Sequence, residues 1–509
     1  MITRRNLMAG LLAATLMPSV LRADPRPRAR PVRTGAGAGV GVAKAVPTDI
    51  EALIANARLG GSVSFAVLDA QDGTLLASRA ADEMRAPAST LKAVTALYAI
   101  DRLGPNHRFR TRVLRAGDML ILAGGGDPVL DTDQLAELAK ATAAAEKTAG
   151  RPAPQRFAIW GGAIPHHDEI TAGQAAHLPY NPAFSGINLN FNRVHLDWRQ
   201  GGASVEARAR RNSPRAYTVA VEVTDRGAPL FAYVPRENGE GWSISRRALG
   251  KSESRWLPVR KPELYAGDVF QTLCRAQGLV LPKPEVITDL PAGDEIASHE
   301  SPPLTEIARD MLDYSTNLTA EVIGLAASGA GTIGASAQAM QDWLQAKGVQ
   351  GAFLFRDHSG LSAGNRVSAR MLAEVMAGPA RSAGLRGLMK PIPLRNADGK
   401  KIPSDITIDA KTGTLNFVSN LSGFAQGPQG RVLAFAVLTG DEERRAATEG
   451  QELPDGVIGW TRRSKGLQQG IIEAWVAQYD RSAPALAVPA APQPTDAPQP
   501  LEDAVAGAG

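Results

Sequence analysis

The chain has 509 residues, of which 44% are hydrophobic and 21% are charged, and its formal net charge at pH 7 is +5. Two or three domains are expected, because this length exceeds what one hydrophobic core usually serves. The composition excludes a wholly disordered chain and a multi-span membrane protein. Nucleic acid is not expected as a partner, because five basic residues crowd one short stretch and leave the rest near neutral: Arg22, Arg26, Arg28, Arg30 and Arg33.

The first residues have the build of an export signal. Arg4 and Arg5 precede an uncharged run over residues 6–21, and the small residues Ser19 and Ala23 lie near its end. The run is shorter than the roughly 20 apolar residues of a membrane-spanning helix, so we expect cleavage, with residues 1–23 as the signal peptide. The arginine pair resembles the twin-arginine signal, and a general secretory signal is the alternative. An exported, periplasmic protein with at most peripheral membrane contact is therefore predicted.

Chain order then gives a strand, a hairpin, a second strand and a helix. Residues 24–46 and 481–509 are rich in Ala and Pro and without aromatics, so we expect a disordered linker and a disordered tail. Residues 62–70 and 74–79 read as strands around Gln71-Asp72-Gly73, and residues 89–103 show helical periodicity.

A change of character over residues 108–258 predicts an inserted, mainly β region of one or two subdomains. Short alternating stretches such as Val194, Leu196 and Trp198 are separated there by Gly and Pro. Helical patterns return around 269–278, 304–312, 335–347 and 369–376, and the chain closes with strands at 406–411, 418–425 and 432–438 and a helix at 467–479. Residues 47–107 and 259–480 are therefore expected to form one discontinuous catalytic domain of α+β class.

Three motifs that carry chemistry each occur once, in a fixed order: Ser89-Thr90-Leu91-Lys92, Ser315-Thr316-Asn317 and Lys411-Thr412-Gly413. On a helix the Lys92 amine lies one turn from the Ser89 hydroxyl, within reach of a general base. The lysine must lose about 3 pKa units to act at neutral pH, and burial with a neighbouring charge such as Lys411 would supply that shift. Each motif alone is as easily a helix cap, a capping turn or a strand end; their conjunction favours an acyl-serine enzyme.

The other two motifs offer the remaining groups. The Ser315 hydroxyl is placed to pass a proton to a leaving amine, while the Asn317 amide can hold both a peptide carbonyl and the lysine. Lys411, Thr412 and Thr414 are suited to a terminal carboxylate.

With these residues the chain resembles the penicillin-binding proteins and serine β-lactamases. The gap of 223 positions from Lys92 to Ser315 is typical of the low-molecular-mass D-alanyl-D-alanine carboxypeptidase/endopeptidase family, which carries a large insert between these motifs. The segment Gly124 to Pro128 resembles the family's glycine-rich GDP segment, and Asp357 to Ser362 resembles its D-G-S-G-L-S loop, with His358 in place of Gly and Thr316 where many members have Asp. The resemblance covers residues 48–480.

The resemblance implies a transpeptidase-type fold, with an antiparallel sheet between helices, and the activity of a serine-type D-Ala-D-Ala carboxypeptidase. Additional activity as a DD-endopeptidase is left open. The implied roles are Ser89 as nucleophile, Lys92 as general base, Ser315 in proton transfer and Asn317 in contact with the substrate. Lys411, Thr412 and Thr414 would bind its carboxylate. The substrate would be a peptidoglycan stem peptide ending in D-Ala-D-Ala, with β-lactams as covalent inhibitors and no cofactor.

Other features carry less. The glycines at 124–126 lack the ending of a phosphate loop, and a structural turn is expected. His166, His167 and Asp168 lack a regular metal-ligand spacing, so no metal is assigned. The lone Cys274 can form no intrachain disulfide and no cysteine-based zinc cluster. Arg366 is a candidate reader of the stem peptide, with ordinary surface charge as the alternative. A β-lactamase and a non-catalytic wall-binding relative remain the alternative functions.

Overall fold

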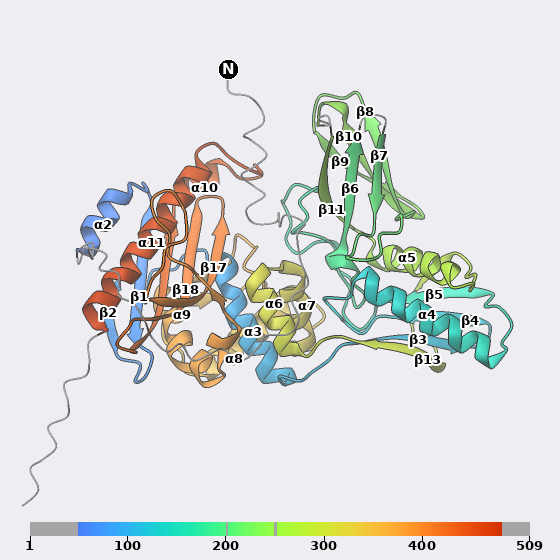
Figure 1. Ribbon diagram of the computed structural model, residues 1–509, viewed down its shortest axis with the longest axis horizontal. Helices are drawn as coiled ribbons and strands as arrows, with labels where there is room; N and C mark the ends of the chain where they lie inside the picture. The colour runs from blue at the N-terminus through green and yellow to red at the C-terminus, as the bar shows by residue number, and fades with distance from the viewer. Residues whose placement is uncertain (1–48, 200–201, 249–251, 481–509) are drawn as a thin grey trace, which may run out of the picture.

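The computed structural model describes residues 49–199, 202–248 and 252–480. The predicted signal peptide, linker and tail lie outside the described residues. Two folded parts lie side by side (Figure 1): the domain expected from the sequence to be catalytic, here called the catalytic domain, which holds both ends of the described chain, and an insert built from its middle.

The catalytic domain is built on a six-stranded antiparallel sheet in the order β16-β17-β18-β19-β1-β2. The first strand pairs with the last, so that Ala66 lies opposite Ala436 and segments from the two ends of the chain share one sheet (Figure 1). The strands are β1 (Ser62–Asp69), β2 (Leu75–Arg79), β16 (Lys390–Pro391), β17 (Thr407–Leu415), β18 (Val418–Gln426) and β19 (Val432–Gly440).

Helices cover both faces of this sheet. Alternate residues of β1 point to opposite sides: Phe65 and Val67 pack with Trp475 of α11 (Val457–Tyr479), whereas Ala66 and Leu68 join the other core. The first face also carries α2 (Ile50–Ala57), and the second carries α3 (Lys92–Leu103), α6 (Leu304–Tyr314), α7 (Asn317–Ser328), α8 (Ile333–Ala346) and α9 (Ala369–Val375). The predicted order of strands, helices and strands is confirmed.

The insert has a five-stranded sheet and two small three-stranded sheets, which stand above it in Figure 1. The larger sheet has the order β12-β5-β4-β3-β13, from β3 (Arg110–Ala116), β4 (Met119–Ala123), β5 (Arg156–Trp160), β12 (Pro284–Ile287) and β13 (Asp294–Glu300), and packs with α4 (Thr132–Ala149) and α5 (Pro262–Ala276). The small sheets are β11-β6-β7, from β6 (Arg193–Arg199), β7 (Gly202–Glu206) and β11 (Ser252–Pro258), and β8-β10-β9, from β8 (Val219–Thr224), β9 (Phe231–Arg236) and β10 (Gly239–Ser245).

The strand pairing carries the insert beyond the boundary expected at residue 258. Strand β13 pairs with β3, with Ser298 opposite Arg112, and β12 pairs with β5, so residues up to Glu300 complete a sheet that begins at β3. The helical pattern at 269–278, which the sequence places in the catalytic domain, belongs to α5, and α5 covers the sheet of the insert. Helix α4 was not expected in a region that reads as β.

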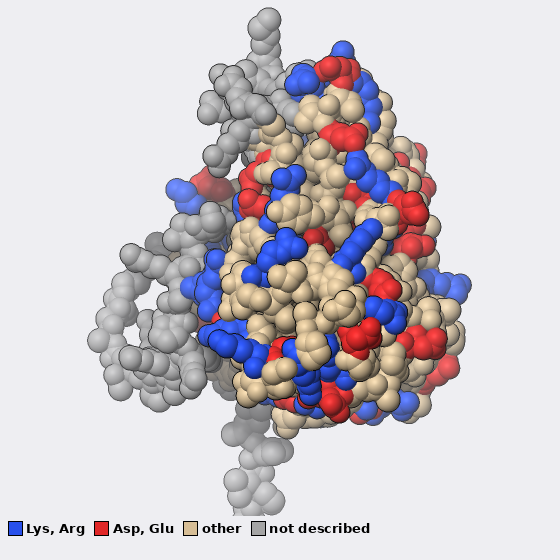
Figure 2. All heavy atoms as spheres, turned by 90° about the vertical axis from the view of Figure 1, so that its right-hand side faces the viewer, with Lys and Arg blue, Asp and Glu red and all other residues tan. Residues whose placement is uncertain are grey.

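Charges of both signs are spread over the end of the insert. Figure 2 shows Lys and Arg interspersed with Asp and Glu on this face, without a wide basic surface among its described residues. Among the described helices, no single one has the length and apolar composition of a membrane span; α7 and α8 meet that criterion only as a pair bent by 70°.

Candidate active site

Ser89 lies at the start of the central helix of the catalytic domain. It sits in a 3-10 turn, η2 (Ala88–Leu91), which leads directly into α3. Ala88, just before it, has φ +47°, a left-handed conformation that costs a non-glycine residue free energy and is found mostly where the surrounding structure enforces it. The Lys92 Nζ donates to the Ser89 Oγ at 3.0 Å, so the one-turn spacing expected from the sequence is present.

Lys92 is buried, and its amine has two further partners. It donates to the Asn317 Oδ1 and to the Ser359 carbonyl, each at 2.7 Å. Burial lowers the pKa of Lys92 to about 7, against the opposite pull of the Asp357 and Glu321 carboxylates. A substantial fraction of the amine is therefore unprotonated at neutral pH, which a general base requires.

The second motif forms the turn between α6 and α7. Ser315 adopts φ +62° as the residue that ends α6, and Asn317 begins α7. The Ser315 Oγ accepts a hydrogen bond from the Lys411 Nζ at 3.0 Å. The site therefore contains two hydrogen-bonded lysine–serine pairs, Lys92 with Ser89 and Lys411 with Ser315.

The third motif lies on β17 against the turn that carries Ser89. A Cβ at Gly413 would stand 2.7 Å from the Pro87 carbonyl oxygen, so glycine is needed for this close approach. Lys411 is buried, and burial together with the charges of Lys92 and Lys390 holds its pKa well below the usual lysine value. Thr412 is partly buried and Thr414 is exposed on the same strand, where they can meet a ligand.

Glu321 and the Ser359 carbonyl, which hold the Lys92 amine in place, were not identified from the sequence. Glu321 is fully buried on α7, one helical turn after Asn317, and it accepts hydrogen bonds from the loop that contains Ser359. The signal for it was present, because residues four apart on a helix share a face. A backbone carbonyl such as that of Ser359 leaves no signal in the sequence.

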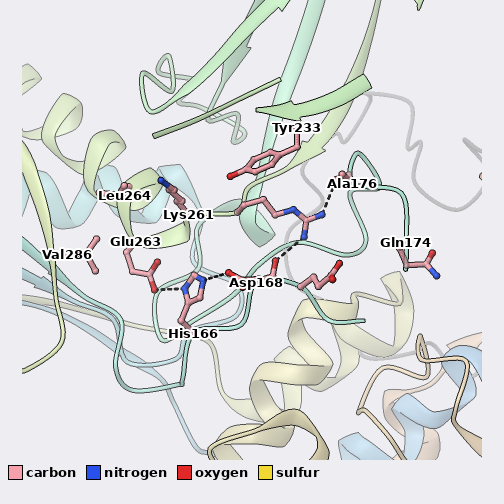
Figure 3. Close-up of a pocket in the computed structure, with 11 residues that line it drawn as sticks. His166, Asp168, Gln174, Ala176, Tyr233, Lys261, Glu263, Leu264 and Val286 are labelled. Carbon is pink, nitrogen blue, oxygen red and sulfur yellow. Dashed lines mark hydrogen bonds and ion pairs between the residues drawn. The ribbon is translucent and has the colours of Figure 1, made fainter. Parts of the chain in front are cut away.

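The insert also reaches the site. The Asn317 Nδ2 donates to the Tyr180 carbonyl at 2.9 Å. Arg260 fixes the segment that carries Tyr180 by donating to the carbonyls of Asp168 (3.0 Å), Ala176 (2.9 Å) and Asn181 (2.8 Å). Arg260, Asp168 and Ala176 line a cavity of about 590 Å³, which is the cavity drawn in Figure 3.

Several other sequence candidates lie outside the cluster. His166 bonds to Glu263 and Asp168 in the cavity of Figure 3, and no group of three or more His, Cys, Asp or Glu among the described residues could hold a metal ion. The side chain of Arg366 donates to the carbonyls of Ala363 and Asn365 in its own loop.

The glycine run after β4 supports the inserted segment instead of a ligand. A Cβ at Gly124 would lie 2.4 Å from the Gly186 carbonyl oxygen, and the Gly126 N–H donates to that oxygen at 2.7 Å. The run thus allows close packing against the segment that continues from Tyr180.

Comparison with known proteins gives the family. The model of the D-Ala-D-Ala carboxypeptidase 3 (S13) family matches residues 46–149 and 243–463. The chain belongs to this family. The predicted family and the predicted activity, a serine-type D-Ala-D-Ala carboxypeptidase, are thereby confirmed.

Individual relatives agree with this assignment. The chain is 27% identical over 497 residues to a D-alanyl-D-alanine carboxypeptidase of Actinomadura sp. (strain R39), which covers 84% of this chain and 89% of the relative. It is 27% identical over 207 residues to the D-alanyl-D-alanine carboxypeptidase DacB of Haemophilus influenzae, over 37% of this chain and 43% of the relative. The crystal structure of penicillin-binding protein 4 (dacB) from H. influenzae matches with a TM-score of 0.63 at 20% identity, over 83% of this chain and 99% of that one, which confirms the predicted fold.

Proposed function

We propose that the chain hydrolyses the terminal D-Ala-D-Ala bond of peptidoglycan stem peptides through an acyl-enzyme on Ser89. The observation that carries this proposal is the Lys92 amine, buried, with a pKa of about 7, 3.0 Å from the Ser89 Oγ. A free serine is a weak nucleophile, and an adjacent unprotonated amine can take its proton as it attacks.

In the acylation step the Ser89 oxygen attacks the carbonyl carbon of the penultimate D-Ala, and Lys92 accepts the serine proton. The backbone N–H groups of Ser89 and Thr414 are proposed to stabilise the oxyanion. The peptide bond breaks, and the leaving amine takes the proton that Lys92 accepted, relayed through Ser315, which is hydrogen-bonded to Lys411; Lys92 is neutral again. Water then attacks the ester, with Lys92 again as the base, and releases the shortened peptide and free Ser89.

Lys411, Thr412 and Thr414 are proposed to bind the terminal carboxylate of the substrate, and Asn317 its peptide. An incoming carboxylate favours the charged form of Lys411, which burial and Lys92 disfavour in the free enzyme. Endopeptidase action would use the same acyl-enzyme with a different leaving amine.

β-Lactams are proposed as covalent inhibitors that acylate Ser89. A related protein, penicillin-binding protein 4 of H. influenzae, has been crystallised with a β-lactam, with a TM-score of 0.62 to this chain. We further propose export to the periplasm, on the basis of the arginine pair and the uncharged run at residues 4–21.

The test is labelling of the intact protein with a fluorescent penicillin, together with release of D-Ala from a stem pentapeptide. Wild type is expected to form a persistent adduct at Ser89 and to release D-Ala; Ser89→Ala is expected to do neither. Ser382→Ala, which truncates an exposed serine that bonds only to the Gly378 carbonyl, serves as the control and should behave as wild type. Rapid turnover of penicillin without D-Ala release would indicate a β-lactamase, and equal behaviour of wild type and Ser89→Ala would refute the proposal.

A further inference from the structure

Glu321 is a fully buried carboxylate whose hydrogen bonds hold the loop behind Lys92. Its Oε2 accepts from the His358 N–H at 3.1 Å and its Oε1 from the Ser359 N–H at 2.9 Å. Two successive backbone donors therefore point at one side chain of α7. This arrangement fixes the backbone on the amino side of Ser359.

The carboxyl side of Ser359 is fixed by a second buried acid. The Gly360 N–H donates to the Asp357 Oδ1 at 2.7 Å. Because a peptide unit is planar and trans, the Ser359 carbonyl points away from this N–H. It therefore points at Lys92, whose Nζ donates to it at 2.7 Å.

The same loop is held on its other sides. The Thr95 Oγ1 donates to the His358 carbonyl at 2.6 Å, and the His358 ring lies 2.7 Å from the Ser336 Oγ through its Nε2. Helices α3, α7 and α8 thus all contribute a polar side chain to one short loop. The loop ends against the turn that carries the nucleophile, where Gly360 packs on the Ala88 carbonyl.

From this geometry we infer that Glu321 is a positioning residue for acylation: it fixes the Ser359 backbone so that the Ser359 carbonyl holds the Lys92 amine beside the Ser89 hydroxyl. The inference rests on the proposed role of Lys92. Glu321 itself does not touch the reacting atoms, and it acts through Ser359.

Several titratable groups surround Lys92. Asp357 and Glu321 raise the pKa of Lys92, whereas Lys411 on β17 is a like charge; burial holds the pKa of the His358 ring at about 3, so this ring is neutral. Burial and Asp357 raise the pKa of Glu321 to about 8, so near pH 7 this group acts mainly through its hydrogen bonds to the loop.

Substitution of Glu321 by Gln would place an amide NH₂ against one of the two loop N–H groups and displace the loop. Lys92 would lose a well-placed acceptor, and this loss disfavours the charged amine. The pKa of Lys92 is therefore expected to fall.

The experiment measures the rate of acylation by a fluorescent penicillin between pH 5 and 9 for the full chain. In wild type the rate should rise through an acid limb near pH 7, the pKa of Lys92. In Glu321→Gln the limb should move to lower pH by about half a unit or more, since the charged amine loses a hydrogen bond that favours it. The plateau should fall about tenfold. Glu146→Gln, which changes a buried carboxylate in α4 that pairs with Arg115 and Arg151, is the control and should leave the limb in place.

The position of the limb decides the outcome, because a loss of folded protein lowers the plateau without moving the limb. A limb that stays in place or moves upward in Glu321→Gln overturns the inference. If this variant does not fold, Glu321→Asp is used, since the shorter side chain cannot reach both N–H groups. A shift of its acid limb to lower pH supports the inference, and an unshifted limb overturns it. If wild type forms no adduct at Ser89, the proposed function fails instead.

Discussion

Gly360 is the residue at which a single methyl group should disturb acylation most directly. A Cβ at this position would lie 1.9 Å from the Ala88 carbonyl oxygen, whereas real contacts of this kind are essentially never shorter than 3.0 Å. Gly360→Ala must therefore move either Ala88, next to the nucleophile, or the loop that holds Lys92, by roughly 1 Å. A misplacement of that size can cost about 100-fold in rate, and we expect a loss of this order in penicillin acylation.

A matched control separates the clash from backbone strain. Gly360 has φ +79° and Gly73, in the hairpin between β1 and β2, has φ +77°, but a Cβ at Gly73 would meet nothing within 4 Å. Alanine at either position costs about 1–2 kcal/mol in the left-handed conformation, so the two variants should lose similar stability from strain alone.

The assay is the acylation rate per folded molecule, with thermal unfolding to measure that fraction. Gly73→Ala should acylate as wild type. If Gly360→Ala acylates within threefold of Gly73→Ala, the loop does not control the geometry of Ser89 and Lys92, and the reasoning is refuted.

Two further predictions concern stability. A Cβ at Gly324 would lie 2.3 Å from the His358 ring, so Gly324→Ala should lower the melting temperature by the equivalent of about 1–3 kcal/mol of overpacking. In a His358→Gly background the same substitution should be neutral or stabilising by up to about 1 kcal/mol, because Ala is the better helix former. Equal effects in both backgrounds would contradict the packing argument. Burial raises the pKa of Asp127 from 3.8 to about 7. Between these two pH values the folded protein keeps a proton that the unfolded chain releases, so stability is lost as the pH rises from 3.8 to about 7. Asp127→Asn should therefore gain about 2–4 kcal/mol over wild type at pH 8 and nothing near pH 4, and a gain that does not vary with pH in unfolding measurements would contradict this account.

The sequence by itself determined which residues form the candidate site. A serine and a lysine one helical turn apart need no tertiary information to be paired, because helix geometry places positions i and i+3 on one face. The order and spacing of the three motifs then indicated a family, and the strands at 62–70, 418–425 and 432–438 followed from their runs of apolar residues.

Only the tertiary structure decided what surrounds Lys92 and how far the insert extends. The Ser359 and Tyr180 carbonyls contact the site through the backbone, which every residue shares, so no residue type marks them. The extent of the insert depends on the pairing of β13 with β3, two strands far apart in the chain, and helical periodicity alone could not assign α5 to one domain or the other. The pKa of Lys92 depends on burial by such distant segments, which is why the sequence could require the shift but only the folded chain supplies it.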